Sequence, residues 1–173
     1  KDNKRGPSWV CVSNDEMYEQ LYKEIDEELQ KHPDRRELSL GMTDTPYLCS
    51  CDKCLKLIAD NLDPDGTEAW DIQLIEVANR VGRHFAKKYP NVRFNFLNYG
   101  GRVPVAGKFK LEPNVGGAAA ELWRNHGLSA DNNERSSFAL QRVAAMSNPG
   151  MGPYIWEYYC NFASYLIPFP NLY

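Results

Sequence analysis

Two long segments of the chain place apolar residues three or four positions apart, with charged residues between them. The first segment carries Met17, Leu21, Ile25 and Leu29 and ends before Pro33. The second runs from Thr67 to Lys88, before Pro90, and carries Leu74, Ala78, Val81 and Phe85 on one face. This spacing predicts two amphipathic helices, and each is expected to cover an apolar surface.

Short runs rich in β-branched and aromatic residues alternate with these helices and predict strands. The five runs are residues 8–13, 37–42, 92–97, 115–123 and 154–159. The fourth run is the weakest, because its Gly and Ala residues favour neither strand nor helix. Asn14 follows the first run with N-cap chemistry for the first helix. Asp131, three residues before Glu134, resembles a capping box and predicts a third helix ahead of the last strand.

Strands that alternate with helices predict an α/β fold with a parallel sheet. Polar and aromatic residues gather where the predicted strands end, at Ser13-Asn14, Thr43-Asp44, Asn98-Tyr99 and Glu157-Tyr158. In a (β/α) barrel these positions share one rim, where active sites lie. No glycine-rich phosphate-binding motif follows the first predicted strand, which disfavours an open nucleotide-binding sheet. We therefore expect the later part of a (β/α)8 TIM-type barrel.

Composition narrows the classes of partner. The 173 residues include 20 basic and 23 acidic side chains, with a net charge of -3, and no basic run is present. This balance argues against nucleic acid as a partner. No stretch has the roughly 18 apolar residues of a membrane-spanning helix, so membrane insertion is not expected. Aromatic residues make up 12% of the chain, and we expect some of these rings to face a ligand.

The order of several motifs resembles the domain-of-unknown-function family 4838. The matching segments are Trp9-x-Cys11-x-Ser13-Asn14, Thr43-Asp44, Cys49-x-Cys51-x-x-Cys54, Asn98-Tyr99, Pro113-Asn114-Val115, Ile155-Trp156-Glu157-Tyr158-Tyr159, Asn161-Phe162 and Pro168-Phe169-Pro170-Asn171. The resemblance implies a bacterial, alpha-glucuronidase-like glycoside-hydrolase domain that is secreted, periplasmic or on the cell surface. It implies a carbohydrate partner, together with the remaining domains of a parent chain.

The same resemblance bears on domain organisation. A complete barrel takes about 250 residues, so residues 1–173 are expected to be one domain fragment, with the barrel incomplete at both ends. Two departures from the family pattern stand out: Glu157 replaces a frequent Asp, and residues 126–133 lack a frequent Cys.

Two acidic residues at predicted strand ends are the candidates for catalysis, Asp44 and Glu157. Glycoside hydrolysis usually needs two carboxyl groups, about 5–10 Å apart, that flank the scissile bond. The sequence equally allows structural roles, in which Asp44 caps a helix or holds a loop and Glu157 is a buried, paired acid. We expect either hydrolysis of a polysaccharide or uronic-acid-containing glycan, or glycan binding without catalysis.

Five residues are candidates for substrate binding: Asn14, Asn98, Tyr99, Trp156 and Tyr158. An aromatic ring packs against the apolar face of a pyranose, and its polar group keeps a hydrogen bond. The alternative is core packing, above all for Trp156. Trp156 and Tyr158 share one side of the predicted strand, and Glu157 lies on the other.

The spacing Cys49-x-Cys51-x-x-Cys54 suits metal ligands, and Cys11 at a neighbouring predicted strand end is a candidate fourth ligand. Three alternatives stay open: a structural zinc site, a disulfide and free thiols. The zinc alternative makes the chain a zinc-stapled scaffold, in which the ion holds segments of a supporting domain together. No cofactor is expected for catalysis itself. Cys160 is expected to be a small buried apolar residue.

Overall fold

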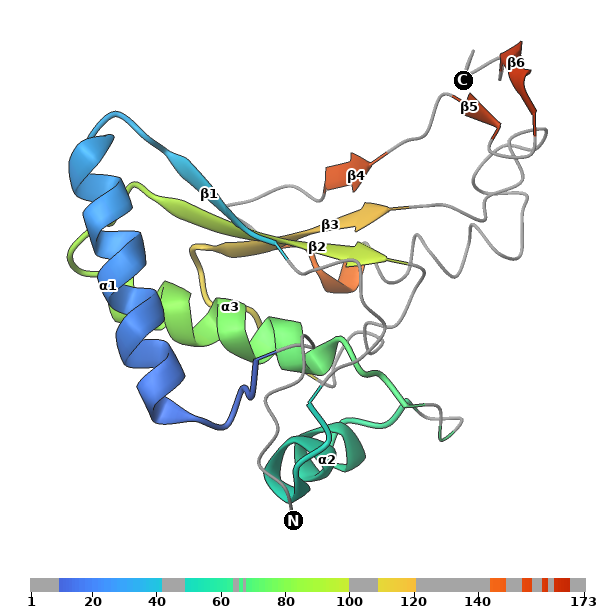
Figure 1. The fold of residues 1–173 in the computed structure, drawn as a ribbon, viewed down its shortest axis with the longest axis horizontal. Helices are drawn as coiled ribbons and strands as arrows, with labels where there is room; N and C mark the ends of the chain where they lie inside the picture. Colours follow the sequence, from blue (N-terminus) through green and yellow to red (C-terminus); the bar gives the residue numbers. More distant parts are fainter. Residues whose placement is uncertain are drawn as a thin grey trace.

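The structure is a computed structural model that describes residues 10–41, 49–63, 66, 68–99, 109–120, 144–148, 154–156, 160–161 and 164–168. Helices and strands alternate as far as residue 99, and the elements that follow in the described part are strands (Figure 1). The helices are α1 (Asp15–Lys31), α2 (Asp52–Ala59) and α3 (Ile72–Phe85). The strands are β1 (Glu37–Leu40), β2 (Arg93–Tyr99), β3 (Val115–Ala120), β4 (Tyr154–Trp156), β5 (Cys160–Asn161) and β6 (Ser164–Pro168).

The first four strands form one parallel sheet in which spatial order follows chain order, β1-β2-β3-β4. Helix α3 runs along one face of this sheet with α1 beside it, and the described helices leave the opposite face open (Figure 1). A doubly wound sheet instead carries helices on both faces and reverses its strand order. The expected α/β fold with parallel strands is confirmed, and its arrangement is consistent with a section of a (β/α) barrel.

The hydrophobic core lies between the sheet and α3. Phe94 and Phe96 of β2 point to this face and are fully buried. On α3 the apolar stripe predicted from the sequence, Leu74, Ala78, Val81 and Phe85, is also buried. The rings of Phe85 and Phe94 stack with centroids 5.9 Å apart. Helix α3 is buried on more than one side because α1 and α2 also pack against it.

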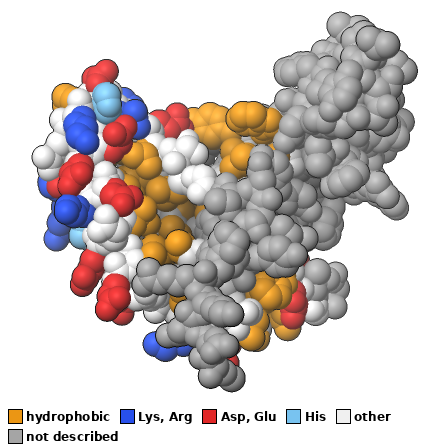
Figure 2. Space-filling view, in the orientation of Figure 1, with side chains coloured by type: hydrophobic (Ala, Val, Ile, Leu, Met, Phe, Trp, Pro, Cys, Tyr) orange, Lys and Arg blue, Asp and Glu red, His pale blue; other side chains and the backbone are white. Residues whose placement is uncertain are grey.

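Helix α1 confirms the first predicted helix. The side chain of Asn14 caps it by accepting a hydrogen bond from the backbone N–H of Glu16, at 3.1 Å. Ile25 and Leu29 of the predicted stripe are buried, and Tyr18 joins them. Charged residues of both signs are interspersed over the outer side of α1 (Figure 2). This mixture agrees with a solvated helix face.

The strand predicted at residues 8–13 is wrong for its described part. Residues 10–14 form no strand, and a turn closes with the N–H of Asn14 donating to the carbonyl of Cys11 at 3.1 Å. Val12 is buried, and its carbonyl accepts a hydrogen bond from the hydroxyl of Tyr18 at 3.0 Å. The apolar run was therefore a signal of burial in the core, because the Val12 side chain is buried and its carbonyl has a hydrogen-bond partner without a neighbouring strand.

The last strands were predicted differently from what the structure has. Of the strand predicted at 154–159, residues 154–156 form β4, and residues 157–159 lie outside the described part. Beyond it, β5 and β6 pair antiparallel in a sheet of their own, which none of the five predicted strands covers. The helix predicted from Asp131 lies mostly outside the described residues. Within the ranges given above, no helix combines the length and apolarity needed to cross a membrane.

Candidate functional site

Four cysteines from two separate segments come together beside the helical layer. Cys11 precedes α1, Cys49 and Cys51 precede α2, and Cys54 lies in the first turn of α2. The four sulfur atoms all lie within 4.8 Å of one another. The Sγ atom of Cys11 is 3.7 Å from that of Cys51 and 3.9 Å from that of Cys54. The turn at Cys11 and the start of α2 at Cys51 hold these side chains in place.

The four thiols differ in exposure and in proton affinity. Cys54 is buried and Cys51 is exposed, with Cys11 and Cys49 between them. Burial raises the pKa of Cys49 to about 12 and also raises the pKa of Cys54. The Ser13 hydroxyl, 3.5 Å from the sulfur of Cys51, lowers the pKa of that thiol to about 6. The lowered pKa of Cys51 favours its thiolate form, and the raised pKa values of Cys49 and Cys54 favour their thiol forms.

This cluster can hold a metal ion, because four sulfur donors surround one point. The spacing of Cys49, Cys51 and Cys54 had predicted such a grouping, with Cys11 as fourth member, and the structure brings these four residues together. One detail of the prediction is wrong: Cys11 does not end a strand, because residues 10–14 form no strand and a turn closes at Asn14.

Gln73 supports the cluster and was missed by the sequence reasoning. It lies in the first turn of α3, is fully buried, and donates a hydrogen bond from Nε2 to the backbone carbonyl of Cys49 at 2.9 Å. Its position on the buried side of an amphipathic helix was the available signal, because a polar residue there needs a partner. Gln73 therefore ties α3 to the cysteine-bearing segment.

A second feature is an open groove of about 320 Å³ on the sheet face that the described helices leave uncovered. Its lining consists of Glu37, Ser39, Asn95, Phe96, Leu97, Ala118, Tyr154 and Trp156. Trp156 and Tyr154 are 55% and 44% exposed, although both are large aromatic residues. They are two residues apart in β4 and therefore point to the same side of the sheet. The groove therefore combines two exposed rings with polar side chains.

The polar side of the groove comes from β1 and β2. Asn95 donates a hydrogen bond to the carboxylate of Glu37 on the neighbouring strand. The Oδ1 atom of Asn95 has no hydrogen-bond partner within the described part of the chain. Neither residue was selected from the sequence. The alternation of Phe94, Asn95 and Phe96 was the signal, because it places Asn95 opposite the buried rings.

The structure places the other predicted substrate-binding residues in different surroundings. Asn98 lies on the helix-facing side, only 2% exposed, and donates a hydrogen bond to the carboxylate of Asp71. Asn14 caps α1. Tyr99 is the last residue of β2, and its side chain lies outside the part that the structure describes. Trp156 alone of the five is described in the groove. The catalytic candidates Asp44 and Glu157, and Tyr158, lie outside the described residues.

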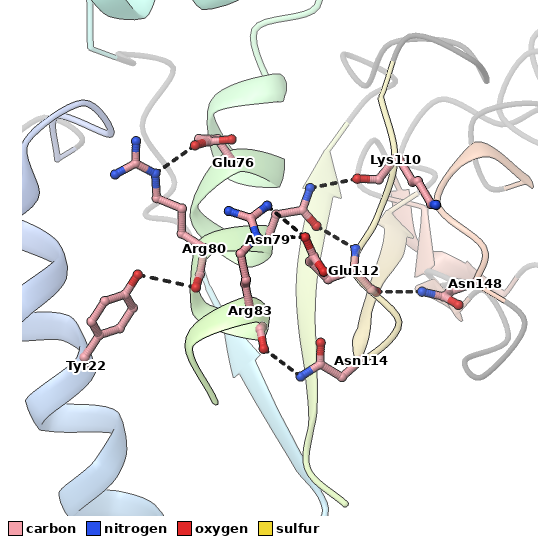
Figure 3. Close-up of polar contacts among 10 residues, drawn as sticks. Tyr22, Glu76, Asn79, Arg80, Arg83, Lys110, Glu112, Asn114 and Asn148 are labelled. Carbon is pink, nitrogen blue, oxygen red and sulfur yellow. Dashed lines mark hydrogen bonds and ion pairs between the residues drawn. The ribbon is translucent and has the colours of Figure 1, made fainter. Parts of the chain in front are cut away.

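Polar contacts fix the segment that leads into β3, next to the groove floor (Figure 3). Asn79 of α3 donates to the carbonyl of Lys110 at 2.9 Å, and its Oδ1 accepts from the N–H of Glu112 at 2.9 Å. Arg83 pairs with the carboxylate of Glu112 at 2.8 Å. Asn114 donates to the carbonyl of Gly82 at 2.9 Å. These bonds set the position of β3 relative to α3.

A protein-family model matches residues 1–173 of the chain, under the description Domain of unknown function (DUF4838). No curated protein matches, and no solved structure matches.

Proposed function

The chain belongs to the DUF4838 family, and from this membership we propose that it is a glycan-binding domain built on part of a (β/α) barrel. The observation that carries the proposal is the groove, in which two exposed aromatic rings of β4 face the same space as the Glu37–Asn95 pair. The alpha-glucuronidase-like character that the family resemblance implies agrees with it. In a closed barrel this sheet face would point to the interior, and the ligand would enter from the rim.

The chemistry of the groove suits a sugar. Exposed rings such as those of Trp156 and Tyr154 pack against the C–H face of a pyranose, and the indole N–H and phenol O–H remain free to bind hydroxyl groups. The exposed carboxylate of Glu37 is an acceptor for sugar hydroxyls. A volume of about 320 Å³ lies at the small end of the range for ligand pockets, about 300–1,000 Å³. The groove thus has room for a short stretch of a glycan.

Hydrolysis is the finer form of this proposal. It needs two carboxyl groups about 5–10 Å apart, and the proposed pair is Asp44 and Glu157. Glu37 adds a third candidate acid, since it lies within the groove. The proposed substrate is a polysaccharide or a uronic-acid-containing glycan, and the proposed location is the periplasm, the cell surface or the medium.

Binding is tested by titrating the protein with a panel of neutral and glucuronic-acid-bearing oligosaccharides in a calorimeter. We expect Trp156→Ala to remove binding and Trp156→Phe to retain most of it, because the phenyl ring preserves the stacking surface. Both variants should fold like the parent, since the side chain is largely exposed. Absence of binding to every oligosaccharide, or equal binding by Trp156→Ala, would contradict the proposal.

Catalysis is tested by measuring sugar release from the same panel. Release that is lost in Asp44→Asn or Glu157→Gln, with binding retained, would identify an enzyme. Release that is lost only in Glu37→Gln would move the catalytic acid into the described groove. Binding without release from any substrate would leave a non-catalytic glycan-binding module.

The cysteine cluster favours a second candidate function, a zinc-stapled scaffold that supports another domain of the parent chain. The specific observation is the meeting of four sulfur atoms within 4.8 Å, which suits a structural zinc ion. In this case the groove binds no glycan, and deletion of the chain should impair the stability of the neighbouring domain. Measuring the thermal stability of the parent protein with and without residues 1–173 separates the two functions.

A further inference from the structure

We infer that Cys11, Cys49, Cys51 and Cys54 bind one Zn²⁺ ion in a closed tetrahedral site that joins the beginnings of α1 and α2. The inference rests on the cluster and Gln73, and it does not depend on the glycan proposal. The groove residues and the four cysteines are different sets of side chains.

The distances between sulfur atoms fit a single tetrahedral ion. A Zn–S bond is about 2.3 Å long, so the edge of a regular ZnS₄ tetrahedron is about 3.8 Å. Two of the six edges, from Cys11 to Cys51 and from Cys11 to Cys54, are 3.7 and 3.9 Å, and no two of the four sulfur atoms are more than 4.8 Å apart. Side chains from two separate segments thus stand at the spacing that one Zn²⁺ requires.

Other sulfur chemistries fit less well. A disulfide needs an S–S distance of about 2.05 Å, and the four described cysteines are free thiols. An iron–sulfur cluster contains several iron and sulfide atoms, which would hold the cysteine sulfurs further apart than one ion does. Four thiolates around one point match Zn²⁺ best, since the ion prefers tetrahedral sulfur ligands and takes part in no redox chemistry.

The surroundings favour the excess negative charge of such a site. Four thiolates and one Zn²⁺ leave two negative charges in excess. Lys53 and Arg80 line a small pocket beside Ser13 and Cys54. Arg80 already pairs with the carboxylates of Glu76 and Asp15, so Lys53 is the cation that favours this charge. The Ser13 hydroxyl, 3.2 Å from the sulfur of Cys11, can donate a hydrogen bond to a thiolate.

Zinc in this position would have a structural role and stabilise the fold. Four protein ligands leave no open coordination position, which is the pattern of a structural site. Cys11 and Cys51 are 40 residues apart in sequence, so the ion would close a long loop. Gln73 extends the link to α3 through its hydrogen bond to the Cys49 carbonyl. Gln73 is therefore a positioning residue, which acts through the backbone of a ligand.

The test begins with metal analysis of the full-length protein, purified under reducing conditions without added metal. We expect one zinc per chain, and on exchange with Co²⁺ the visible absorption spectrum of a tetrahedral thiolate complex. Cys11→Ser and Cys51→Ser should lose the zinc, and Cys160→Ser should keep it as the matched control. Because Cys51 is exposed, its Ser variant should remain folded even if a variant of buried Cys54 does not.

Chelation provides the second readout. Removal of zinc from the unsubstituted protein should lower its melting temperature, and added Zn²⁺ should restore it. Stoichiometric zinc that persists in both Cys11→Ser and Cys51→Ser, bound iron in place of zinc, or a metal-free protein that takes up no zinc would each overturn the inference. None of these results would alter the calorimetric test of glycan binding, so the two proposals fail separately.

Discussion

Gln73 of α3 donates a hydrogen bond from its side-chain Nε2 to the backbone carbonyl of Cys49, 2.9 Å away, while its own Oε1 finds no partner within the described part of the chain. The bond crosses 24 residues of sequence. It connects the helix beneath the sheet with the segment that carries three of the four clustered cysteines.

Gln73→Met should lower the free energy of unfolding by about 1–2 kcal/mol, because the partly buried carbonyl of Cys49 loses its donor while the side-chain volume is kept. If zinc binds as inferred, the variant should also release it faster to a chelator. Denaturant unfolding and chelator competition measure the two effects. Gln20→Met on the exposed face of α1 is the control. A Gln73→Met protein as stable as the parent would show that this bond contributes little.

Gly82→Ala should destabilise the fold, although Ala is normally the better helix residue by about 1 kcal/mol. A Cβ atom at position 82 would lie 2.4 Å from Cγ2 of Val115 and 2.8 Å from Oδ1 of Asn114. We expect a loss of about 1–3 kcal/mol from the overpacking. Gly41→Ala is the matched control, because nothing lies within 4 Å of its added Cβ. Thermal unfolding of both variants measures the difference in stability. A Gly82→Ala protein more stable than the unsubstituted one would refute the close approach of α3 to β3.

Asn98→Asp should be strongly destabilising at neutral pH, because it places a second carboxylate beside buried Asp71. The expected loss is about 3 kcal/mol. The pair should hold a proton more tightly than in the unfolded chain, so the stability deficit shrinks as the pH falls toward about 4. Asn95→Asp, which creates the same pairing with exposed Glu37, should cost much less. Equal losses of stability for the two variants would show that burial of the Asn98–Asp71 pair does not affect the free energy of unfolding.

Asp26→Asn should reduce the stability at neutral pH and leave it unchanged in strong acid. Hydrogen bonds from Lys88 and then from Tyr89, at 2.5 and 2.7 Å, lower the pKa of Asp26 below its ordinary value. The stabilisation is therefore complete above the unfolded pKa of about 3.9 and is lost as the pH falls through the lower folded pKa. Urea midpoints measured across this range, with Asp34→Asn as control, test the prediction. A difference between parent and Asp26→Asn that did not change with pH would contradict it.

Periodicity predicted the helices well where burial is one-sided. The stripe of Ile25 and Leu29 was found because one face of α1 meets the core and the other meets water. Residues 8–13 were misread as a strand because a short apolar run carries no information on its partner. Val12 is buried in the core, and its carbonyl accepts a hydrogen bond from Tyr18 of α1.

The candidate site residues likewise include some that the sequence predicts and some that it does not. The grouping of the cysteines could be predicted from sequence, since the spacing of Cys49, Cys51 and Cys54 is typical of metal ligands. The polar residues Asn98 and Asn95 could not be ranked from sequence alone. Both lie on β2, and only the side of the sheet that receives α3 decides which one is bonded to Asp71 in the interior and which one faces the groove.

Strand β3 has the sequence Val-Gly-Gly-Ala-Ala-Ala and lies between β2 and β4. Its side chains are nearly absent on the groove side, where Ala118 stands opposite Leu97 on one neighbour and Tyr154 on the other. The floor of the groove is thus mostly backbone. Position 118 is consequently a natural point for engineering: each larger side chain introduced there would make the groove shallower while leaving its rings and its acid in place, so ligand size could be selected independently of ligand chemistry.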